Sequence, residues 1–436
     1  MNVFADLLRR EKRLGRPLNV AVVGAGFLGG GLIHELSRIR GMCPALVSNR
    51  TPEKAMEKLR SAGVPASSIV RCDDPESAER ALREGLRVVS VEPALGAHLP
   101  SVDVVMEATG TMHIGTEVAL EAIEHRKHVV EANPEVQVTV GAWLKAQADA
   151  AGVVYSDIDG DQPGIIMNLH AYCAGLGLEP VVAGNCKGVM KRYATPETQA
   201  SFAAQAGISP WIATAAADGT KLNLEMALVA NATGMRPGCV GMTGLETRLE
   251  SLLGDFRRAG LLGGAPIVDF TLGIPSGVFV IARSSDPHLA REFRYLKMGD
   301  GPEYLFYRPY VLCAFEAPLT AAEAVLYGTA TATPGPEVVS DVATYAKRPL
   351  RAGEKLEGIG GEKHYGQIVE VEEFRRENAL PVGLAEYATL RTDVRKDSMV
   401  RYDDVVLEED RTAVRLRRRI EELERRAEEL ERRPTP

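Results

Sequence analysis

Three glycines in Val23-Gly-Ala-Gly-Phe-Leu-Gly29 follow an apolar run and precede residues with helical spacing. In a strand, turn and helix of this kind, the first glycine allows the turn, the second lets the backbone approach a pyrophosphate, and the third lets the helix pack on the strand. The helix N-terminus offers unpaired N–H groups to the anion. The predicted dinucleotide-binding residues of this turn are Gly24, Gly26, Phe27, Leu28 and Gly29.

A second set of candidate cofactor contacts follows the predicted strand at 44–48. An acidic residue near the end of this strand holds a ribose 2′-hydroxyl, whereas an arginine accommodates a 2′-phosphate. Here the chain has Asn49 and Arg50 and no acid. The sequence therefore favours NADP over NAD, with the alternative that Arg50 is only a solvated residue at the start of a helix.

Two further strand ends carry small or polar residues, and ligands of parallel sheets collect at such ends. Thr109 and Gly110 leave room beside a nicotinamide ribose, although a plain turn would also explain them. Asn133 follows the next strand, where it could reach the ribose or the substrate.

Three carboxylates at a spacing of two residues, Asp157, Asp159 and Asp161, precede Gln162 at a predicted domain junction. Oxygen ligands of this kind suit a divalent cation, but aspartates are also common in turns beside Gly and Pro. We expect Asp161 to face the substrate as a catalytic residue and Gln162 to be a substrate contact, with a metal as the alternative reading of the three acids.

Candidate catalytic and substrate-binding residues also lie further along the chain. Lys187 ends a predicted strand among small residues, where a partly desolvated lysine can donate a proton or stabilise an oxyanion; a surface lysine is the alternative. Glu225 lies on a predicted helix at 222–230 that follows a predicted strand at 212–221. Arg308 lies among aromatic residues, where it could clamp a phosphate or carboxylate or stack on a tyrosine.

The predicted helices and strands that must position these residues change in length and order along the chain. Short apolar strands alternate with amphipathic helices over about 150 residues, which is the doubly wound α/β pattern. Longer helices and strands follow, and then comes a small β-rich stretch. The C-terminal segment has apolar residues at spacings of three and four, which predicts an amphipathic helix that pairs with a copy of itself or packs on the body. These seam residues are Ala413, Leu416, Ile420, Leu423, Ala427 and Leu430.

The expected organisation is therefore α/β, with a doubly wound Rossmann domain first. The predicted domains are a dinucleotide-binding domain at 1–158, an α+β catalytic and oligomerisation domain at 159–336, a β-rich domain at 337–407 and a C-terminal helix at 408–436. Part of 311–330 is expected to return to the nucleotide domain. The helical seam predicts a homo-oligomer.

Composition excludes several classes of protein. The 436 residues carry a net charge of -8, and no basic cluster free of glutamates suggests a nucleic-acid groove. The six cysteines form no C-x-x-C pair, so we expect no disulfide framework and a reducing cytoplasm. No apolar segment reaches the roughly 18 residues of a membrane span.

The chain resembles homoserine-dehydrogenase-like oxidoreductases with a C-terminal SAF (antifreeze-like) domain, from Pro17 to Leu407. The best-understood proteins that it is similar to are the 1-deoxy-D-xylulose 5-phosphate reductoisomerase-like proteins, which use NADPH. The motifs in the nucleotide and catalytic parts are Val23-Gly-Ala-Gly-Phe-Leu-Gly29, Glu107-Ala-Thr-Gly110, Leu144-Lys-Ala-Gln-Ala-Asp149, Ala230-Asn-Ala-Thr-Gly234, Gly277-Val-Phe-Val280 and Tyr307-Arg-Pro-Tyr310. Those in the SAF part are Ala346-Lys-Arg-Pro-Leu-Arg-Ala-Gly353, Gly358-Ile-Gly-Gly361 and Leu380-Pro-Val-Gly-Leu-Ala-Glu386.

The resemblance implies a pyrophosphate on Gly24–Gly29, a catalytic-lysine role for Lys187 and substrate contacts at Asp161 and Arg308. Two departures limit it. The junction reads Gly160-Asp-Gln-Pro163 where the reductoisomerase-like proteins have Gly-Asp-Glu-Pro, so one carboxylate is missing. Homoserine dehydrogenases have Ala-Asn-Lys after the corresponding strand, whereas this chain has Ala132-Asn-Pro. The missing lysine argues against homoserine dehydrogenase activity.

The sequence thus predicts an NADP-dependent oxidoreductase that acts on a carbonyl or hydroxyl carbon of a small, polar, anionic substrate. Reductoisomerase action on a sugar phosphate and dehydrogenation of an amino or hydroxy acid are both open. The alternative from another class is a nucleotide-dependent sensor or scaffold that uses the C-terminal third to bind a partner.

Overall fold

The computed structural model describes residues 2–335 and 337–431 and divides into two compact units. Unit 1 consists of Met1–Ile158, Cys313–Thr333 and Leu407–Pro436, and unit 2 consists of Asp159–Leu312 and Pro334–Val406. The expected boundary after residue 158 coincides with the boundary between the units. The returning segment, 313–333, overlaps the stretch for which a return was expected.

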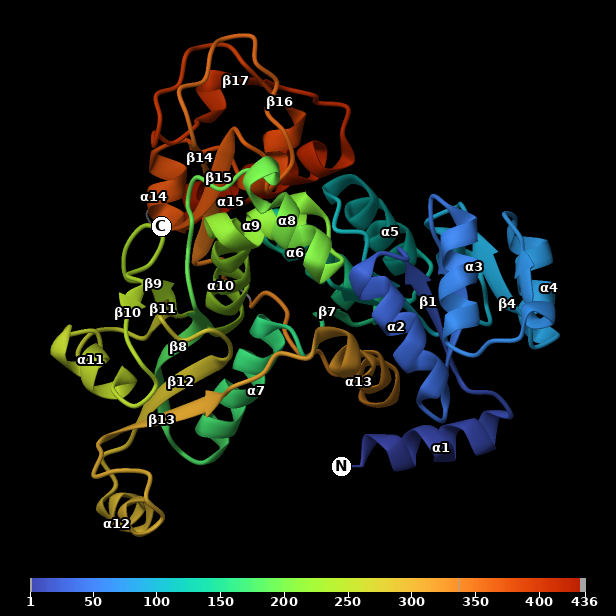
Figure 1. Ribbon diagram of the computed structural model, residues 1–436, viewed down its shortest axis with the longest axis horizontal. Helices are drawn as coiled ribbons and strands as arrows, with labels where there is room; N and C mark the ends of the chain where they lie inside the picture. The colour runs from blue at the N-terminus through green and yellow to red at the C-terminus, as the bar shows by residue number, and fades with distance from the viewer. Residues whose placement is uncertain (1, 336, 432–436) are drawn as a thin grey trace. The chain divides into compact units, whose positions relative to one another are not determined.

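Unit 1 is built on a sheet of seven parallel strands in the order β3-β4-β2-β1-β5-β6-β7. Figure 1 labels β1, β4 and β7 of this sheet. The order runs outward in both directions from β1, as in a doubly wound sheet, so the expected fold class is confirmed. The strands are β1 (Leu18–Val23), β2 (Met42–Ser48), β3 (Ile69–Arg71), β4 (Arg87–Ser90), β5 (Val104–Glu107), β6 (His128–Glu131) and β7 (Tyr155–Asp157).

The helices of unit 1 begin where local capping chemistry allows. Three of them, α3, α4 and α6, have proline in the first turn, where its missing N–H costs nothing. The helices are α1 (Val3–Leu14), α2 (Phe27–Arg38), α3 (Pro52–Ser61), α4 (Pro75–Arg83), α5 (Met112–Glu124), α6 (Pro134–Ala151), α13 (Cys313–Tyr327) and α15 (Thr412–Glu431). Two short 3₁₀ helices, η1 (Ala66–Ser68) and η2 (Leu95–His98), lie in the connections.

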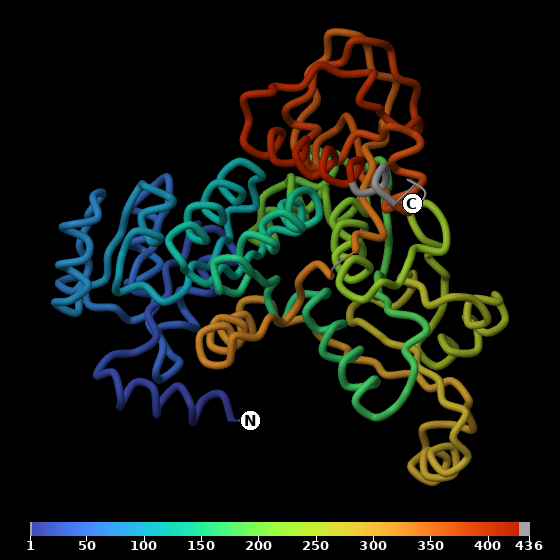
Figure 2. Tube along the Cα trace, turned by 180° about the vertical axis from the view of Figure 1, so that it is seen from behind, coloured from blue at the N-terminus to red at the C-terminus, as the bar shows by residue number. Residues whose placement is uncertain are grey.

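The returning helix α13 packs on α2, and Figure 2 shows this orange segment beside the blue part of the chain. A Cβ added to Gly31 of α2 would lie 2.6 Å from the Cβ of Ala314, so the glycine permits the close approach. The Tyr327 hydroxyl donates a hydrogen bond of 2.6 Å to Asp6 of α1. A segment distant in sequence therefore completes one face of the nucleotide fold.

The C-terminal helix α15 packs on α5 and α6 of unit 1. Ala413 and Val414 are buried, and the Arg417 guanidinium donates to the Thr139 carbonyl of α6. The structure thus shows the second of the two expected arrangements, packing on the body. The side chains of Ala427 and Leu430 lie outside the described residues, and the homo-oligomer stays a prediction.

Unit 2 contains a mixed sheet in the order β10-β11-β8-β12-β13, with β9 also paired to β11. β8 is parallel to β11 and antiparallel to β12. The strands are β8 (Glu179–Lys187), β9 (Arg236–Pro237), β10 (Leu245–Glu246), β11 (Ile267–Leu272), β12 (Val278–Arg283) and β13 (Glu303–Arg308). The helices of this part are α7 (Gln162–Gly175), α8 (Pro196–Ala206), α9 (Pro210–Asp218), α10 (Thr220–Thr233), α11 (Leu252–Arg258) and α12 (Pro287–Tyr295).

The strand predicted at 212–221 is wrong, because these residues form α9 and the start of α10. The Ser209 hydroxyl caps α9, Pro210 stands in its first turn, and the alanines that follow favour helix. Gly219, with a φ of 91°, separates the two helices. Lys221 consequently lies one helical turn from Glu225 on α10.

The β-rich stretch, expected at 337–407, belongs to unit 2 as far as Val406. Its hairpin contacts α10, because the Gly366 N–H donates to the Thr220 hydroxyl and the Ile368 N–H donates to Asn223. Its elements are β14 (Ser340–Ala346), β15 (His364–Glu370), α14 (Val371–Arg376), η3 (Val382–Tyr387), β16 (Ala388–Leu390), η4 (Tyr402–Asp404) and β17 (Val405–Leu407). Within the described ranges, we find no helix with the length and apolar character needed to cross a bilayer.

Candidate active site

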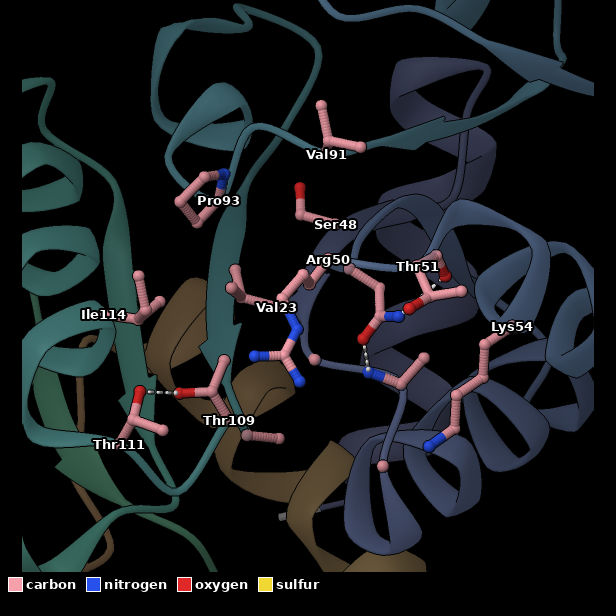
Figure 3. Close-up of a pocket in the computed structure, with 15 residues that line it drawn as sticks. Val23, Ser48, Arg50, Thr51, Lys54, Val91, Pro93, Thr109, Thr111 and Ile114 are labelled. Carbon is pink, nitrogen blue, oxygen red and sulfur yellow. Dashed lines mark hydrogen bonds between the residues drawn. The ribbon is translucent and has the colours of Figure 1, made fainter. Parts of the chain in front are cut away.

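A pocket of about 540 Å³ opens at the carboxyl ends of the unit 1 strands (Figure 3). It lies over the glycine turn, the end of β2 and the end of β5, where a dinucleotide binds in this fold. The residues that line it are Val23, Gly24, Ala25, Gly26, Ser48, Asn49, Arg50, Thr51, Lys54, Val91, Pro93, Ala108, Thr109, Thr111 and Ile114.

The three glycines of the turn meet distinct steric demands. Gly24 has a φ of 98°, and a Cβ there would lie 2.8 Å from the Ala108 carbonyl oxygen. A Cβ on Gly29 would lie 1.9 Å from the Gly24 carbonyl oxygen, so only glycine allows this helix to approach this turn. Gly26, the N-cap of α2, has open space within 4 Å of its Cβ position, which is room for a pyrophosphate. The turn therefore fits the predicted group.

Phe27 and Leu28 do not line the pocket, although the sequence placed them among its contacts. The Phe27 side chain is 70% exposed, and Leu28 packs against the core of unit 1. Both residues lie in the first turn of α2, where their backbone N–H groups, not their side chains, face an anion at the helix N-terminus.

Asn49 and Arg50 contribute differently to the pocket. The side-chain oxygen Oδ1 of Asn49 accepts a hydrogen bond of 3.0 Å from the Ala25 N–H. The side-chain NH₂ group of Asn49 donates one of 2.7 Å to the main-chain carbonyl of Thr51. Asn49 thus fastens the glycine turn to the start of α3. The Arg50 guanidinium points into the pocket (Figure 3), and none of the fifteen described lining residues is acidic.

Of the three residues predicted beside the nicotinamide, Thr109, Gly110 and Asn133, only Thr109 lines the pocket. Thr109 lines the pocket, and both its N–H and its hydroxyl donate to one Glu107 carboxylate oxygen. Gly110, with a φ of 66°, makes the turn after Thr109 and does not line the pocket. Asn133 is fully buried at the start of α6 and does not line it either.

A row of buried carboxylates, not identified as such from the sequence, lies beneath this side. Glu107, Glu131 and Asp157 end the neighbouring strands β5, β6 and β7 and are paired in register. Burial, followed by the nearby Glu107, raises the pKa of Glu131 well above its ordinary value. Gln137 bridges the row, because its amide donates to Asp157 and to the Glu131 carbonyl.

A second charged cluster forms in unit 2 and contains three of the predicted site residues. Asp161 caps α7, and its carboxylate accepts from the N–H of Gln162, the partly buried first residue of that helix. The Lys221 ammonium lies 3.5 Å from Asp161 and 3.2 Å from Glu225. The Asn185 amide of β8 donates to the other Glu225 oxygen at 3.0 Å.

Lys187, at the end of β8, belongs to the same electrostatic group. Burial lowers the pKa of Lys187, and the attraction of Glu225 works in the opposite direction. Burial also raises the pKa of Glu225 to about 7, although Lys221 and Lys187 favour its ionised form. The unit 2 cluster of Asp161, Asn185, Lys187, Lys221 and Glu225 therefore contains an acid that titrates near neutrality beside two cationic side chains.

Lys221 and Asn185 were not among the predicted site residues. The i,i+4 spacing of Lys221 and Glu225 was the available signal, but the strand predicted over 212–221 hid it. Asn185 gives no signal in the sequence, because its partner is 40 residues away.

The predicted aspartate metal set is not gathered in the structure. Asp157 accepts from Gln137 in unit 1, whereas Asp159 in unit 2 accepts from the Gly160 N–H and the Asn168 amide. In the part of the chain that the structure describes, the one group with ligand atoms close enough for a metal consists of His98, Glu121 and His125.

Arg308 adopts the stacked arrangement that the sequence left as the alternative to an anion clamp. It ends β13, and its guanidinium carbon lies 4.5 Å from the centre of the Tyr310 ring. Cation–π contacts of this kind hold a guanidinium flat on the ring.

One family model matches part of the chain. Residues 160–317 match the model of the family described as oxidoreductase DRL, catalytic domain. No curated protein sequence matches the chain. The match begins one residue after the start of unit 2 and includes the whole unit 2 cluster.

Solved structures with a similar fold are distant. A probable dehydrogenase from Thermotoga maritima has 12% identity and a TM-score of 0.38, over 61% of this chain and 72% of that one. GenD2 from gentamicin A biosynthesis, in complex with NAD, has 15% identity and a TM-score of 0.37, over 74% and 89%. An aldose-aldose oxidoreductase from Caulobacter crescentus has 17% identity and a TM-score of 0.38, over 73% and 92%. Similarity at this level assigns no substrate.

The family match and the pocket support the same class of enzyme. Unit 1 provides a dinucleotide fold with a fitting glycine turn, and unit 2 provides a domain that matches an oxidoreductase catalytic model. The chain is an NAD(P)-dependent oxidoreductase.

Proposed function

We propose that this oxidoreductase uses NADP and acts on the carbonyl or hydroxyl carbon of a small, polar, anionic substrate. The observation that carries the proposal is the unit 2 cluster, in which the ammonium groups of Lys187 and Lys221 accompany the buried Glu225. Two cations in a largely desolvated place suit an anionic substrate and an oxygen that gains negative charge.

The roles of the side chains follow from their charge and surroundings. When bound, the dinucleotide supplies or accepts the hydride. In the reducing direction Lys187 donates a hydrogen bond and then a proton to the substrate oxygen, and Glu225 in its protonated form supplies the replacement proton. Lys221, held between Asp161 and Glu225, orients the acids and adds positive charge beside the substrate. General acid catalysis of this kind contributes on the order of 10²- to 10⁴-fold.

The preference for NADP is proposed from Arg50 and Lys54, which line the pocket without an accompanying acid. A 2′-phosphate pairs with a guanidinium, whereas a ribose hydroxyl prefers a carboxylate. We expect Arg50→Ala to weaken NADPH binding by about tenfold or more while NADH binding changes little, as measured by fluorescence titration. Equal weakening of both nucleotides would remove the argument for a 2′-phosphate site.

The substrate class is tested by following NADPH consumption over a panel of small carbonyl compounds. Anionic compounds should be turned over in preference to neutral ones of the same size. Comparing phosphorylated ketoses with their dephosphorylated forms separates reductoisomerase action on a sugar phosphate, which the family resemblance favours, from dehydrogenation of an amino or hydroxy acid. If neutral sugars were the best substrates, the anion-binding role of the unit 2 cluster would be wrong.

Two arginines of unit 2, Arg308 and Arg192, contact aromatic rings. Arg308 stacks on Tyr310, and Arg192 donates to Gln367 and lies 5.2 Å from the centre of the Tyr365 ring. We therefore assign the anion-binding role to Lys187 and Lys221 and not to these guanidinium groups.

A further inference from the structure

A compact group of side chains that can bind a metal lies in unit 1. It is at the opposite end of the strands from the nucleotide pocket. His98 ends η2, and Glu121 and His125 lie one turn apart at the end of α5. The end of α5 leads directly into β6 at His128, so the group lies near the amino-terminal ends of the strands. None of the three residues lines the nucleotide pocket.

The three side chains already converge. One ligand atom from each residue lies within 4.8 Å of one from every other. The His98 Nε2 lies 3.2 Å from a Glu121 carboxylate oxygen, and the two imidazole rings have centroids 4.3 Å apart at an angle of 68°. Tetrahedral zinc with bonds of about 2.0–2.2 Å needs ligand atoms roughly 3.4 Å apart, so the side chains must close slightly around the ion.

The His125 ring is oriented by a partner outside the group of ligand atoms. Its Nδ1 lies 2.9 Å from the Glu121 carbonyl oxygen and donates to it in the tautomer that leaves Nε2 unprotonated. Metal-binding histidines commonly use their second nitrogen in this way, which fixes the ring and the tautomer. The backbone of α5 thus fixes the His125 ring, whose Nδ1 also lies 3.7 Å from a Glu121 carboxylate oxygen.

Burial and ligand type indicate the kind of ion. The side chains of His98, Glu121 and His125 are 35%, 36% and 40% exposed, so an ion and its water can enter from solvent. Two imidazoles and one carboxylate suit Zn²⁺ and similar divalent transition metals better than Mg²⁺ or Ca²⁺. Three protein ligands leave a coordination position for water.

We propose that His98, Glu121 and His125 form a binding site for Zn²⁺ or a similar divalent transition metal, separate from the nucleotide pocket. The ion ties the end of η2 to α5. The same connection carries Val91 and Pro93, which line the nucleotide pocket, so the metal fixes a segment that borders both sites. This proposal does not depend on the identity of the substrate.

The chain offers a matched control on the same helix. His113 and Glu117 form an i,i+4 pair at 3.4 Å, with side chains 44% and 45% exposed, much like the pair of Glu121 and His125. In the described part of the chain no third ligand completes a metal group with them. His113→Ala therefore removes an exposed histidine from α5 without touching the proposed site.

The test is calorimetric titration of the full-length, tag-free chain with ZnCl₂ after treatment with a chelator. We expect one Zn²⁺ per chain, and a loss of affinity of about tenfold or more in His98→Ala, in His125→Ala and in Glu121→Gln, since each removes a ligand. His113→Ala should bind Zn²⁺ as the unaltered chain does. Circular dichroism of each variant shows that it is folded, which the exposure of these residues leads us to expect.

A second measurement separates this site from the six free thiols. Co²⁺ bound to nitrogen and oxygen ligands gives visible bands without the strong near-ultraviolet band of a cobalt thiolate. The proposal is overturned if the chain binds no stoichiometric Zn²⁺, if the cobalt spectrum shows thiolate ligands, or if His98→Ala and His125→Ala bind Zn²⁺ as well as His113→Ala does.

Discussion

The two units differ in what surrounds their buried acids. In unit 1 the neighbours are other acids, and in unit 2 they are lysines. In unit 1, Glu107 and Glu131 lie side by side at strand ends, and burial together with the neighbouring acid raises the pKa of Glu131 far from its ordinary value. In unit 2, Glu225 is equally buried but has Lys221 at 3.2 Å, and its pKa rises only to about 7. Nearby cations thus bring one buried acid into the range where it can exchange protons at physiological pH.

This difference separates a structural acid from a functional one. An acid whose pKa is raised well above its ordinary value by burial and by another acid is suited to donating a hydrogen bond, and not to delivering and recovering a proton during turnover. A group with a pKa near the working pH can do both. We therefore place the proton chemistry in unit 2 and the support of the nucleotide pocket, through Thr109, in unit 1.

The largest expected effect is on catalysis by the unit 2 cluster. Lys187→Ala should lower kcat/KM by about 10²- to 10⁴-fold in steady-state assays of NADPH oxidation, because it removes the proposed proton donor. Lys297→Ala, which alters an exposed lysine of the same unit, is the control and should change kcat/KM by less than about twofold. Full turnover in Lys187→Ala would show that Lys187 is not the catalytic lysine.

A third buried acid, Asp218, extends the comparison to stability. Its partner Lys347 lies 2.7 Å away and also donates to the carbonyls of Ala194 and Gly361. Lys347→Met should lower the free energy of unfolding by about 3–5 kcal/mol in urea titrations, because it leaves a buried carboxylate without its counter-charge. The exposed pair of Arg351 and Asp393 is the contrast, and Arg351→Met should cost less than about 1 kcal/mol. Similar losses in both variants would contradict this ranking.

The acid row of unit 1 predicts a dependence of stability on pH. Because the pKa of Glu131 is raised in the folded chain, its contribution is fully present below about pH 4.5 and is lost as the pH rises towards the folded value. Glu131→Gln should flatten the decline in the urea midpoint as the pH rises above about 4.5. Glu124→Gln, at an exposed position on α5, is the control. Parallel curves for Glu131→Gln and the unaltered chain would show that Glu131 ionises freely.

The smallest effect concerns the pH profile of the reaction. In the direction of alcohol oxidation Glu225 must accept a proton, so kcat/KM should rise about tenfold between pH 6 and pH 8, around the pKa of about 7. Glu225→Gln should remove this rise. A profile that keeps the same inflection in Glu225→Gln would assign the titration to another group.

Local patterns predicted the nucleotide side of the molecule well. The glycine turn depends on residues within one strand, one turn and one helix, so its roles could be inferred from spacing alone. Phe27 and Leu28 show the limit of this approach, because a motif gives backbone positions without saying where the side chains point. Asn133 is fully buried and does not line the pocket, since a strand end predicts proximity but not exposure, and its contact with a ribose or substrate stays a prediction.

The unit 2 cluster was harder to predict because it depends on contacts between elements. Lys187, Asp161 and Glu225 were identified one by one, but Asn185 and Lys221 became visible only when β8 and α10 were packed together. The alanine-rich stretch before Gly219 was read as a strand, although its capping residues favour helix. The carboxylate row was missed because each glutamate ends a different strand, and only the register of β5, β6 and β7 aligns them.

The division of unit 1 into three chain segments also sets the order in which the protein can fold during synthesis. Helix α2 leaves the ribosome early, but its partner α13 ends at Tyr327, about 300 residues after Gly31. At about 5–20 residues per second, the apolar face of α2 waits roughly 15–60 s for its cover, while the larger part of unit 2 is made in between. The nascent nucleotide fold is therefore a substrate for chaperones before it is a receptor for nucleotide.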